Sequence, residues 1–90
     1  EQGRLAEGLA LMRRSVACFR RAGRLDDEYL SALGRLAEAH RKAGDIDGAV
    51  RIAEHVLAAR KEAHGEKDPK YGTALNNLAE ALHLELHARG

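Results

Sequence analysis

Apolar residues recur along the chain at intervals of three and four positions, which is the spacing of one face of an α-helix. Three glycines interrupt the pattern at equal intervals of 21 residues, and Gly23, Gly44 and Gly65 each follow a run that ends in basic or polar residues. Glycine readily takes the positive φ with which many helices end. The pattern therefore predicts four helices joined by short loops, so that neighbouring helices run antiparallel. Their expected bounds are 4–22, 26–43, 46–64 and 69–87.

Acidic residues behind each glycine mark the start of the next helix, where a carboxylate caps exposed N–H groups. The expected starts are Asp26-Asp27-Glu28, then Asp45 or Asp47, and finally Asp68-Pro69, with proline at the first helical position. The side chains expected to face the core share the helical spacing. They are Leu5, Leu9, Met12, Val16, Phe19, Leu30 or Leu33, Leu36, Ala37, His40, Ile46, Val50, Ala53, Val56, Leu57, Tyr71, Leu75, Leu78 and Leu82.

Composition supports a single small helical domain and argues against several other classes. Alanine supplies 17 of the 90 residues and leucine 13, whereas strands favour β-branched and aromatic residues, so a strand-rich fold is excluded. The single cysteine, Cys18, rules out an internal disulfide and is expected to pack in the apolar interior. No apolar run approaches the roughly 18 residues of a membrane span, and no signal segment opens the chain. With a net charge of +1, the sequence predicts a soluble, cytoplasmic, all-helical domain.

The chain repeats itself at a period of 42 residues, which corresponds to two helices and two loops. The segment Ala32–Ala39 (ALGRLAEA) overlies Ala74–Ala81 (ALNNLAEA), and six of the eight residues are identical. At an offset of 41, the first predicted helix overlies the third, with small residues over small ones and aliphatic residues over aliphatic ones. The helices therefore alternate between two kinds, in the order B-A-B-A.

The repeated segments resemble a known family. The stretch Leu33–His40 (LGRLAEAH), followed by Gly44–Ala49 (GDIDGA), resembles a tetratricopeptide repeat. Its continuation through His64–Pro69 (HGEKDP) and Leu75–Ala79 (LNNLA) is similar to the 42-residue kinesin-light-chain-like subtype. The resemblance implies an all-α solenoid of antiparallel helical hairpins that stack on one another. Its close helix approaches are expected at the small residues Ala37, Ala49 and Ala79.

The resemblance also divides the chain into parts of three repeats. Residues 1–24 correspond to the B helix of a preceding repeat, 25–66 to one full A–B repeat, and 67–90 to the A helix of a following repeat. Because the first and last helices lack their partners, we expect a fragment of a longer array, or self-association through these end helices. Leu86 lies at the position equivalent to Gly44, which predicts that the last helix runs past the family's turn.

In this family the A helices line a concave face that binds peptides, so the resemblance implies a site for a peptide or partner segment. The corresponding positions are Ser31, Gly34, Arg35, Glu38, Arg41, Thr73, Asn76, Asn77, Glu80 and His83. The alternative interpretation is a solvated polar face, which any amphipathic helix needs. The two adjacent asparagines favour binding, because they are poor helix formers and each offers both a donor and an acceptor.

Other chemical groups are weaker candidates. A basic run in the first helix favours a solvated face over nucleic-acid binding, because no interleaved aromatic residues offer stacking; it comprises Arg13, Arg14, Arg20, Arg21 and Arg24. His83 and His87 are four residues apart but lack a third metal ligand. His40 is expected to pack, and His64 to lie on the surface. No nucleophile–base pair and no phosphate loop is present, so we expect no catalysis, no metal, no cofactor, no nucleic acid and no membrane partner.

Three functions remain open on this reading. The first is an interaction module that binds a protein or peptide partner on its concave face. The second is a structural or oligomerisation repeat that stacks on neighbouring repeats or on a second chain. The third is an accessory array of a multidomain regulator or enzyme whose activity lies elsewhere.

Overall fold

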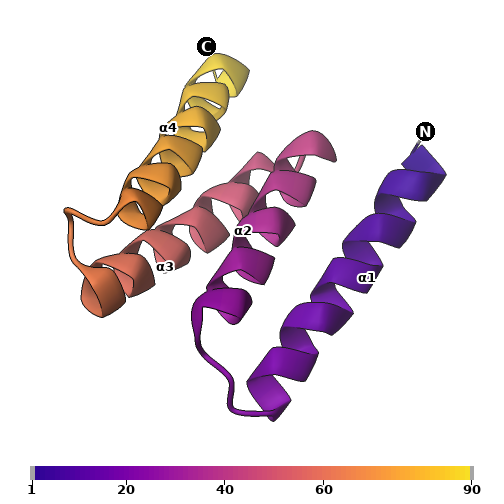
Figure 1. The fold of residues 1–90 in the computed structure, drawn as a ribbon. Helices are drawn as coiled ribbons and strands as arrows, with labels where there is room; N and C mark the ends of the chain where they lie inside the picture. The colour runs from indigo at the N-terminus through magenta and orange to yellow at the C-terminus, as the bar shows by residue number, and fades with distance from the viewer. Residues whose placement is uncertain (1, 90) are drawn as a thin grey trace.

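The computed structural model describes residues 2–89 and contains four α-helices in this part of the chain, with no β-strand. They are α1 (Gln2–Arg21), α2 (Asp27–Lys42), α3 (Ile46–His64) and α4 (Pro69–Arg89). Consecutive helices run antiparallel, and α1 and α4 lie at opposite ends of the assembly (Figure 1). The predicted all-α fold of helical hairpins is confirmed. The bounds of α3 match the expectation, and five other ends differ by one or two residues. The helix α1 spans 2–21 rather than 4–22, α2 spans 27–42 rather than 26–43, and α4 ends at 89, past Leu86, rather than at 87.

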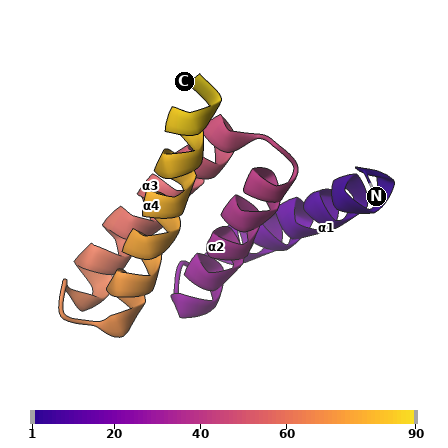
Figure 2. The ribbon, with the colours of Figure 1, turned by 90° about the horizontal axis from the view of Figure 1, so that it is seen from above.

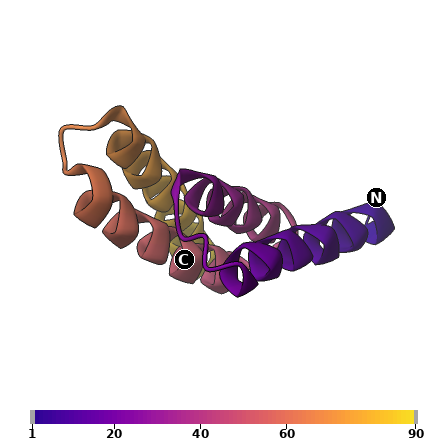
Figure 3. The same ribbon diagram turned by 60° about the horizontal axis from the view of Figure 1, so that its bottom comes forward.

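The helices form a flat body with two layers. Its extents are 34 × 30 × 16 Å, and the smallest of these accommodates two helices at the usual separation of about 8–10 Å. In Figure 3 the first turns of α2 and α4 lie in the upper layer, and the last turns of α1 and α3 lie in the lower layer. Within the described residues, α2 packs against all three other helices, and α3 also packs against α4. By contrast, the backbone of α1 approaches only that of α2 among the described helices, and α1 extends away from α3 and α4 in the view from above (Figure 2).

Carboxylate caps define where the helices begin. Asp26 accepts a hydrogen bond from the backbone N–H of Tyr29 at 3.3 Å. Asp45, rather than Asp47, caps α3 by accepting from the backbone N–H of Gly48 at 3.1 Å. At the start of α4, Asp68 accepts from the N–H of Lys70 at 2.8 Å. These contacts satisfy N–H groups that have no partner inside the helices.

The three punctuating glycines have the positive φ that the pattern predicted, with values of 70°, 91° and 83° for Gly23, Gly44 and Gly65. Gly65 differs from a left-handed helical residue because its ψ is 169°. That combination is populated almost only by glycine. The connection between α3 and α4 therefore depends on glycine at this position.

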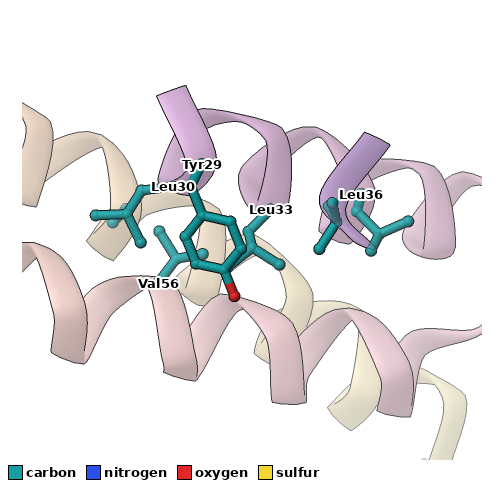
Figure 4. Close-up of a cluster of buried hydrophobic side chains, with 7 residues drawn as sticks. Tyr29, Leu30, Leu33, Leu36 and Val56 are labelled. Atoms are coloured by element: carbon teal, nitrogen blue, oxygen red, sulfur yellow. The ribbon is translucent and has the colours of Figure 1, made fainter. Parts of the chain in front are cut away.

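The core lies between α2 and its neighbours. Tyr29, Leu30, Leu33 and Leu36 of α2 are buried in one cluster with Val56 of α3 (Figure 4). Val16 of α1 and Ala74 of α4 complete this cluster. A second, smaller cluster joins α3 to α4 through Ala49, Val50 and Ala81. Alanines at this contact allow the two helix backbones to approach closely.

Several expected core positions are exposed instead. On α4, Leu75 and Leu82 are 47% and 39% exposed, because Ala74 and Ala81 face α3 in their place. Ala79 is also exposed, so the close approach predicted there is absent from the described structure. The residues of α2 at the 42-residue offset, Leu33, Ala37 and His40, are buried. No described helix covers the corresponding side of α4.

Two positions on α1 also differ from the prediction. Leu5 near its start is 41% exposed, and it lines an open hollow between α1 and the second half of α2. Cys18 is exposed as well, so the prediction that it packs in the interior is wrong. The helical spacing fixes which residues share a face, but the neighbouring residue Phe19 takes the packed position next to α2.

Candidate functional site

A groove runs between α2 and α4 and consists of two adjoining hollows. The larger has a volume of about 480 Å³ and lies near the starts of both helices. The smaller is a cleft of about 20 Å³ that continues toward their ends. Three residues line both hollows and so form the middle of the groove: Gly34, Glu38 and Asn77.

Most of the residues predicted for the site lie together in this groove. They are Ser31, Gly34, Arg35, Glu38, Arg41, Thr73, Asn77 and Glu80. These residues recur every three or four positions on two neighbouring helices, so each helix presents them on a single face. The groove therefore has two polar walls, one from α2 and one from α4.

Asn76 and His83 line neither hollow. Asn76 is rotated by about 100° from its neighbour around the helix axis, and its side-chain amide instead donates to Glu80 Oε1 at 3.5 Å. The ring of His83 contacts the ring of His87 edge to face, with 4.3 Å between the ring centroids. Asn77, in contrast, makes no side-chain hydrogen bond within the described residues, so its donor and acceptor are both available in the groove.

The groove has opposite charges at its two ends. Near the helix starts, it is lined by the cations Arg35, Arg60 and Lys70. Toward the helix ends, the carboxylates of Glu38 and Glu80 outnumber the single cation Arg41, which lies 3.8 Å from Glu38. Glu38 also lines the first hollow, and Asp27 pairs with Arg60 and Lys70. The excess positive charge at that end is therefore carried mainly by Arg35, and a ligand that lies along the groove meets more positive charge at one end and more negative charge at the other.

Asp27 organises the positive end of the groove. Its carboxylate accepts a hydrogen bond from Arg60 Nη1 at 2.9 Å, lies 2.7 Å from His64 Nε2, and also accepts from Lys70 Nζ. The hydrogen bonds from Lys70 and His64 hold the pKa of the Asp27 carboxyl well below its usual range. We call these four residues, Asp27, Arg60, His64 and Lys70, the Asp27 cluster. It ties the start of α2 to the end of α3 and the start of α4.

Sequence reasoning missed Arg60 and Lys70 as groove residues. Arg60 has a side chain that is only 8% exposed, and its second guanidinium nitrogen lies 3.4 Å from the hydroxyl of Ser31. The partners of Asp27 are 33, 37 and 43 residues away in sequence. No local pattern signals contacts of that length, although an arginine inside an apolar helical stripe indicates that a distant carboxylate is needed.

A second polar contact holds the turn between α2 and α3. His40 is buried, as predicted, and its Nδ1 lies 2.8 Å from Asp45 Oδ2. The pKa of Asp45 is lowered, first by the N–H of Gly48 and then by His40. A Cβ at Gly48 would lie 2.4 Å from Asp45 Oδ2, so glycine is required for this close approach. The contact has a structural role and lies outside the groove.

The sequence raises the question of three other kinds of site: a metal site, a membrane span and a basic surface on α1. No group of three His, Cys, Asp or Glu side chains is close enough there to hold a metal ion. None of the described helices is both long and apolar enough to cross a membrane. The arginines of α1 are exposed, and Arg24 pairs with Asp26 and Glu28 at 3.1 and 3.0 Å.

Comparison with known proteins agrees with the helical architecture. The family model of the tetratricopeptide repeat matches residues 1–62 and, in a second overlapping alignment, residues 28–88. Searches of curated proteins and of solved structures returned no significant match. Repeats of this type are non-catalytic modules that generally mediate protein–protein interactions. Since the two matches together cover nearly the whole chain, the protein belongs to the tetratricopeptide repeat family.

Proposed function

We propose that this protein binds an extended segment of a partner protein in the groove between α2 and α4. The observation that carries the proposal is Asn77, which lines both hollows and has no side-chain hydrogen-bond partner within the described residues. An amide both donates to a peptide carbonyl and accepts from a peptide N–H. Gly34 on the facing helix has nothing within 4 Å of a virtual Cβ, so the groove is open opposite this amide.

The charged walls determine which segments fit. Arg35 has no ion pair among the described residues and therefore offers its guanidinium to a ligand carboxylate. Glu80 lies on the other wall toward the negative end and suits a basic ligand residue. Both contacts would be exposed to solvent, so their contribution should weaken with salt. The amide contact of Asn77 should be much less sensitive to salt, because it involves no net charge.

We also propose the finer family assignment and the repeat boundaries. The 42-residue self-similarity and the Leu-Asn-Asn-Leu-Ala segment support the kinesin-light-chain-like subtype. They also support one full A–B repeat over 25–66, flanked by a B helix (1–24) and an A helix (67–90), of which residues 1 and 90 lie outside the described structure. On this assignment α2 and α4 are A helices. A cytoplasmic location remains a prediction from the sequence.

The test begins with a selection from a library of random twelve-residue peptides, with the parent protein as the target. Selected peptides are then titrated against Asn77→Ala and against the matched control Asn76→Ala. We expect Asn77→Ala to weaken binding by about 1–3 kcal/mol, because it leaves peptide polar groups unpaired, and Asn76→Ala to have little effect. Equal binding of both variants, together with loss of binding in Arg13→Glu, would move the site to the arginine-rich face of α1.

A second candidate function is a structural repeat that stacks on a second copy or on neighbouring repeats. It is favoured by the exposed leucines of α4, since Leu75, Leu82 and Leu86 are 47%, 39% and 71% exposed along one side of the helix. The 42-residue offset relates Leu75 to Leu33, which is buried in α2. An A helix in this position is expected to be covered by a B helix.

A further inference from the structure

A second hollow lies on the other side of α2, between α1 and α3, and shares no lining residue with the groove. Its volume is about 500 Å³. It exists because the backbones of α1 and α3 do not approach each other in the described structure, while both pack on α2. Ala17 lines the α1 wall, and its small side chain leaves the space open.

The floor of the hollow is aliphatic and comes from three helices. It consists of Val16, Leu33, Leu36 and Ile52. Leu33 and Leu36 are almost fully buried by the surrounding residues, so they lie at the bottom of the hollow. Such a surface favours an aliphatic side chain of a ligand, which would lose its contact with water there.

The rim of the hollow is cationic. Three arginines of α1 line it, namely Arg13, Arg20 and Arg21, and no carboxylate is among the lining residues. Arg20 donates from Nε to the hydroxyl of Tyr29 at 2.9 Å, which orients its side chain. Arg13 and Arg21 have no ion pair or hydrogen bond within the described residues. Their guanidinium groups are therefore available to carboxylates of a partner.

We propose that this hollow is a second docking site, for a protein segment in which an aliphatic residue is flanked by aspartate or glutamate. The floor takes the aliphatic side chain and the α1 rim takes the carboxylates. Nucleic acid fits less well, because no aromatic side chain lines the hollow for base stacking. A membrane surface fits less well too, because the apolar residues are recessed below the arginines rather than protruding from them.

The experiment uses a capped, fluorescein-labelled peptide that carries two leucines flanked on each side by two glutamates. Binding is measured by fluorescence anisotropy to the full chain and to two neighbouring variants, Arg13→Glu and Arg14→Glu. Both change the charge of α1 equally, but Arg14 does not line the hollow. We expect Arg13→Glu to weaken binding about tenfold more than Arg14→Glu, because it replaces an attractive contact with a repulsive one.

Two further arms test the floor of the hollow. A peptide with serines in place of the leucines should lose most of its affinity, and Ala17→Leu, which fills the hollow, should weaken binding of the leucine peptide. Ala10→Leu, an exposed change on the same helix, serves as the control and should not.

The proposal is overturned by any of three results: no binding of the leucine peptide to the parent protein, equal losses in Arg13→Glu and Arg14→Glu, or undiminished binding of the serine peptide. It is also overturned if single-stranded oligonucleotides or vesicles of anionic lipid bind with the same preference for Arg13 over Arg14. Since Asn77→Ala leaves this hollow intact, unchanged peptide binding in that variant supports a site separate from the groove.

Discussion

At the residue scale, two glycines inside helices differ in the space that is available for a side chain. At Gly34, a Cβ would meet nothing within 4 Å, whereas at Gly48 it would lie 2.4 Å from a carboxylate oxygen of Asp45 and 3.1 Å from Nδ1 of His40. Neither residue has a positive φ. The two positions therefore share a backbone conformation and differ only in the space beside it.

This difference predicts opposite effects of the same substitution. Gly34→Ala should raise the free energy of unfolding by about 0.5–1 kcal/mol, because it reduces the entropy of the unfolded chain. Gly48→Ala should lower it by about 1–3 kcal/mol, because Asp45 and His40 must move and the cap of α3 is disturbed. Urea denaturation of both variants provides the measurement. A lower midpoint for Gly34→Ala would reveal a close contact that the structure does not contain.

At the scale of elements, the Asp27 cluster is the main polar link between helices. It joins three helices through one carboxylate, and its arginine is buried while the carboxylate remains accessible. The lowered pKa of Asp27 means that its ionised form is favoured in the folded state. The cluster therefore stabilises the fold at neutral pH and lies at the positive end of the groove.

Acidification should remove this contribution in a defined pH range. A carboxyl with a lowered folded pKa contributes its full stability above the ordinary value of 3.8, and loses it as the pH falls below that value through the folded pKa. Asp27→Asn should therefore be less stable than the parent at pH 7, and the difference should shrink as the pH falls below about 4. Urea midpoints across this range test the prediction, with the exposed residue Asp47→Asn as the control. A constant difference at all pH values would contradict the assigned role of the ionised carboxylate.

At the scale of the whole molecule, the described helices leave one side of α4 uncovered. Two of the exposed leucines there, Leu75 and Leu82, correspond at the 42-residue offset to Leu33 and His40 of α2, which are buried. We expect concentration-dependent association through this side, since α1 of a second chain is a B helix on the proposed repeat assignment and could cover it. Leu82→Glu should shift the sedimentation coefficient toward that of a monomer.

The matched control for this experiment is Leu25→Glu, which alters an exposed leucine in the loop between α1 and α2. It makes the same chemical change away from the uncovered side of α4, so it should not affect association. A parent protein that stays monomeric at the highest accessible concentration would contradict the stacking function. Equal effects of the two substitutions would assign the association to general hydrophobicity.

The periodicity of the sequence predicted which residues share a face of one helix. It failed to predict burial and pairing that depend on residues distant in the sequence. Arg35 and Asn77 could be placed in a groove because each lies on the polar face of a regular helix. The distinction between Asn76 and Asn77 could not be made, because it depends on how α4 is rotated against α3. Arg60 was missed because its carboxylate partner is 33 residues away. The predicted burial of Cys18 failed for the same reason, since packing against α2 selects the neighbouring Phe19.

The groove can be tested most directly by nuclear magnetic resonance of the side-chain amides. The chain has two asparagines and one glutamine, so a ¹⁵N-labelled sample gives only three pairs of side-chain amide signals. During titration with the tightest peptide from the random library, the Asn77 pair should shift most, the Asn76 pair less, and the Gln2 pair should remain unchanged. A peptide that leaves the Asn77 signals in place while it shifts the arginine Nε signals of α1 would contradict the central claim.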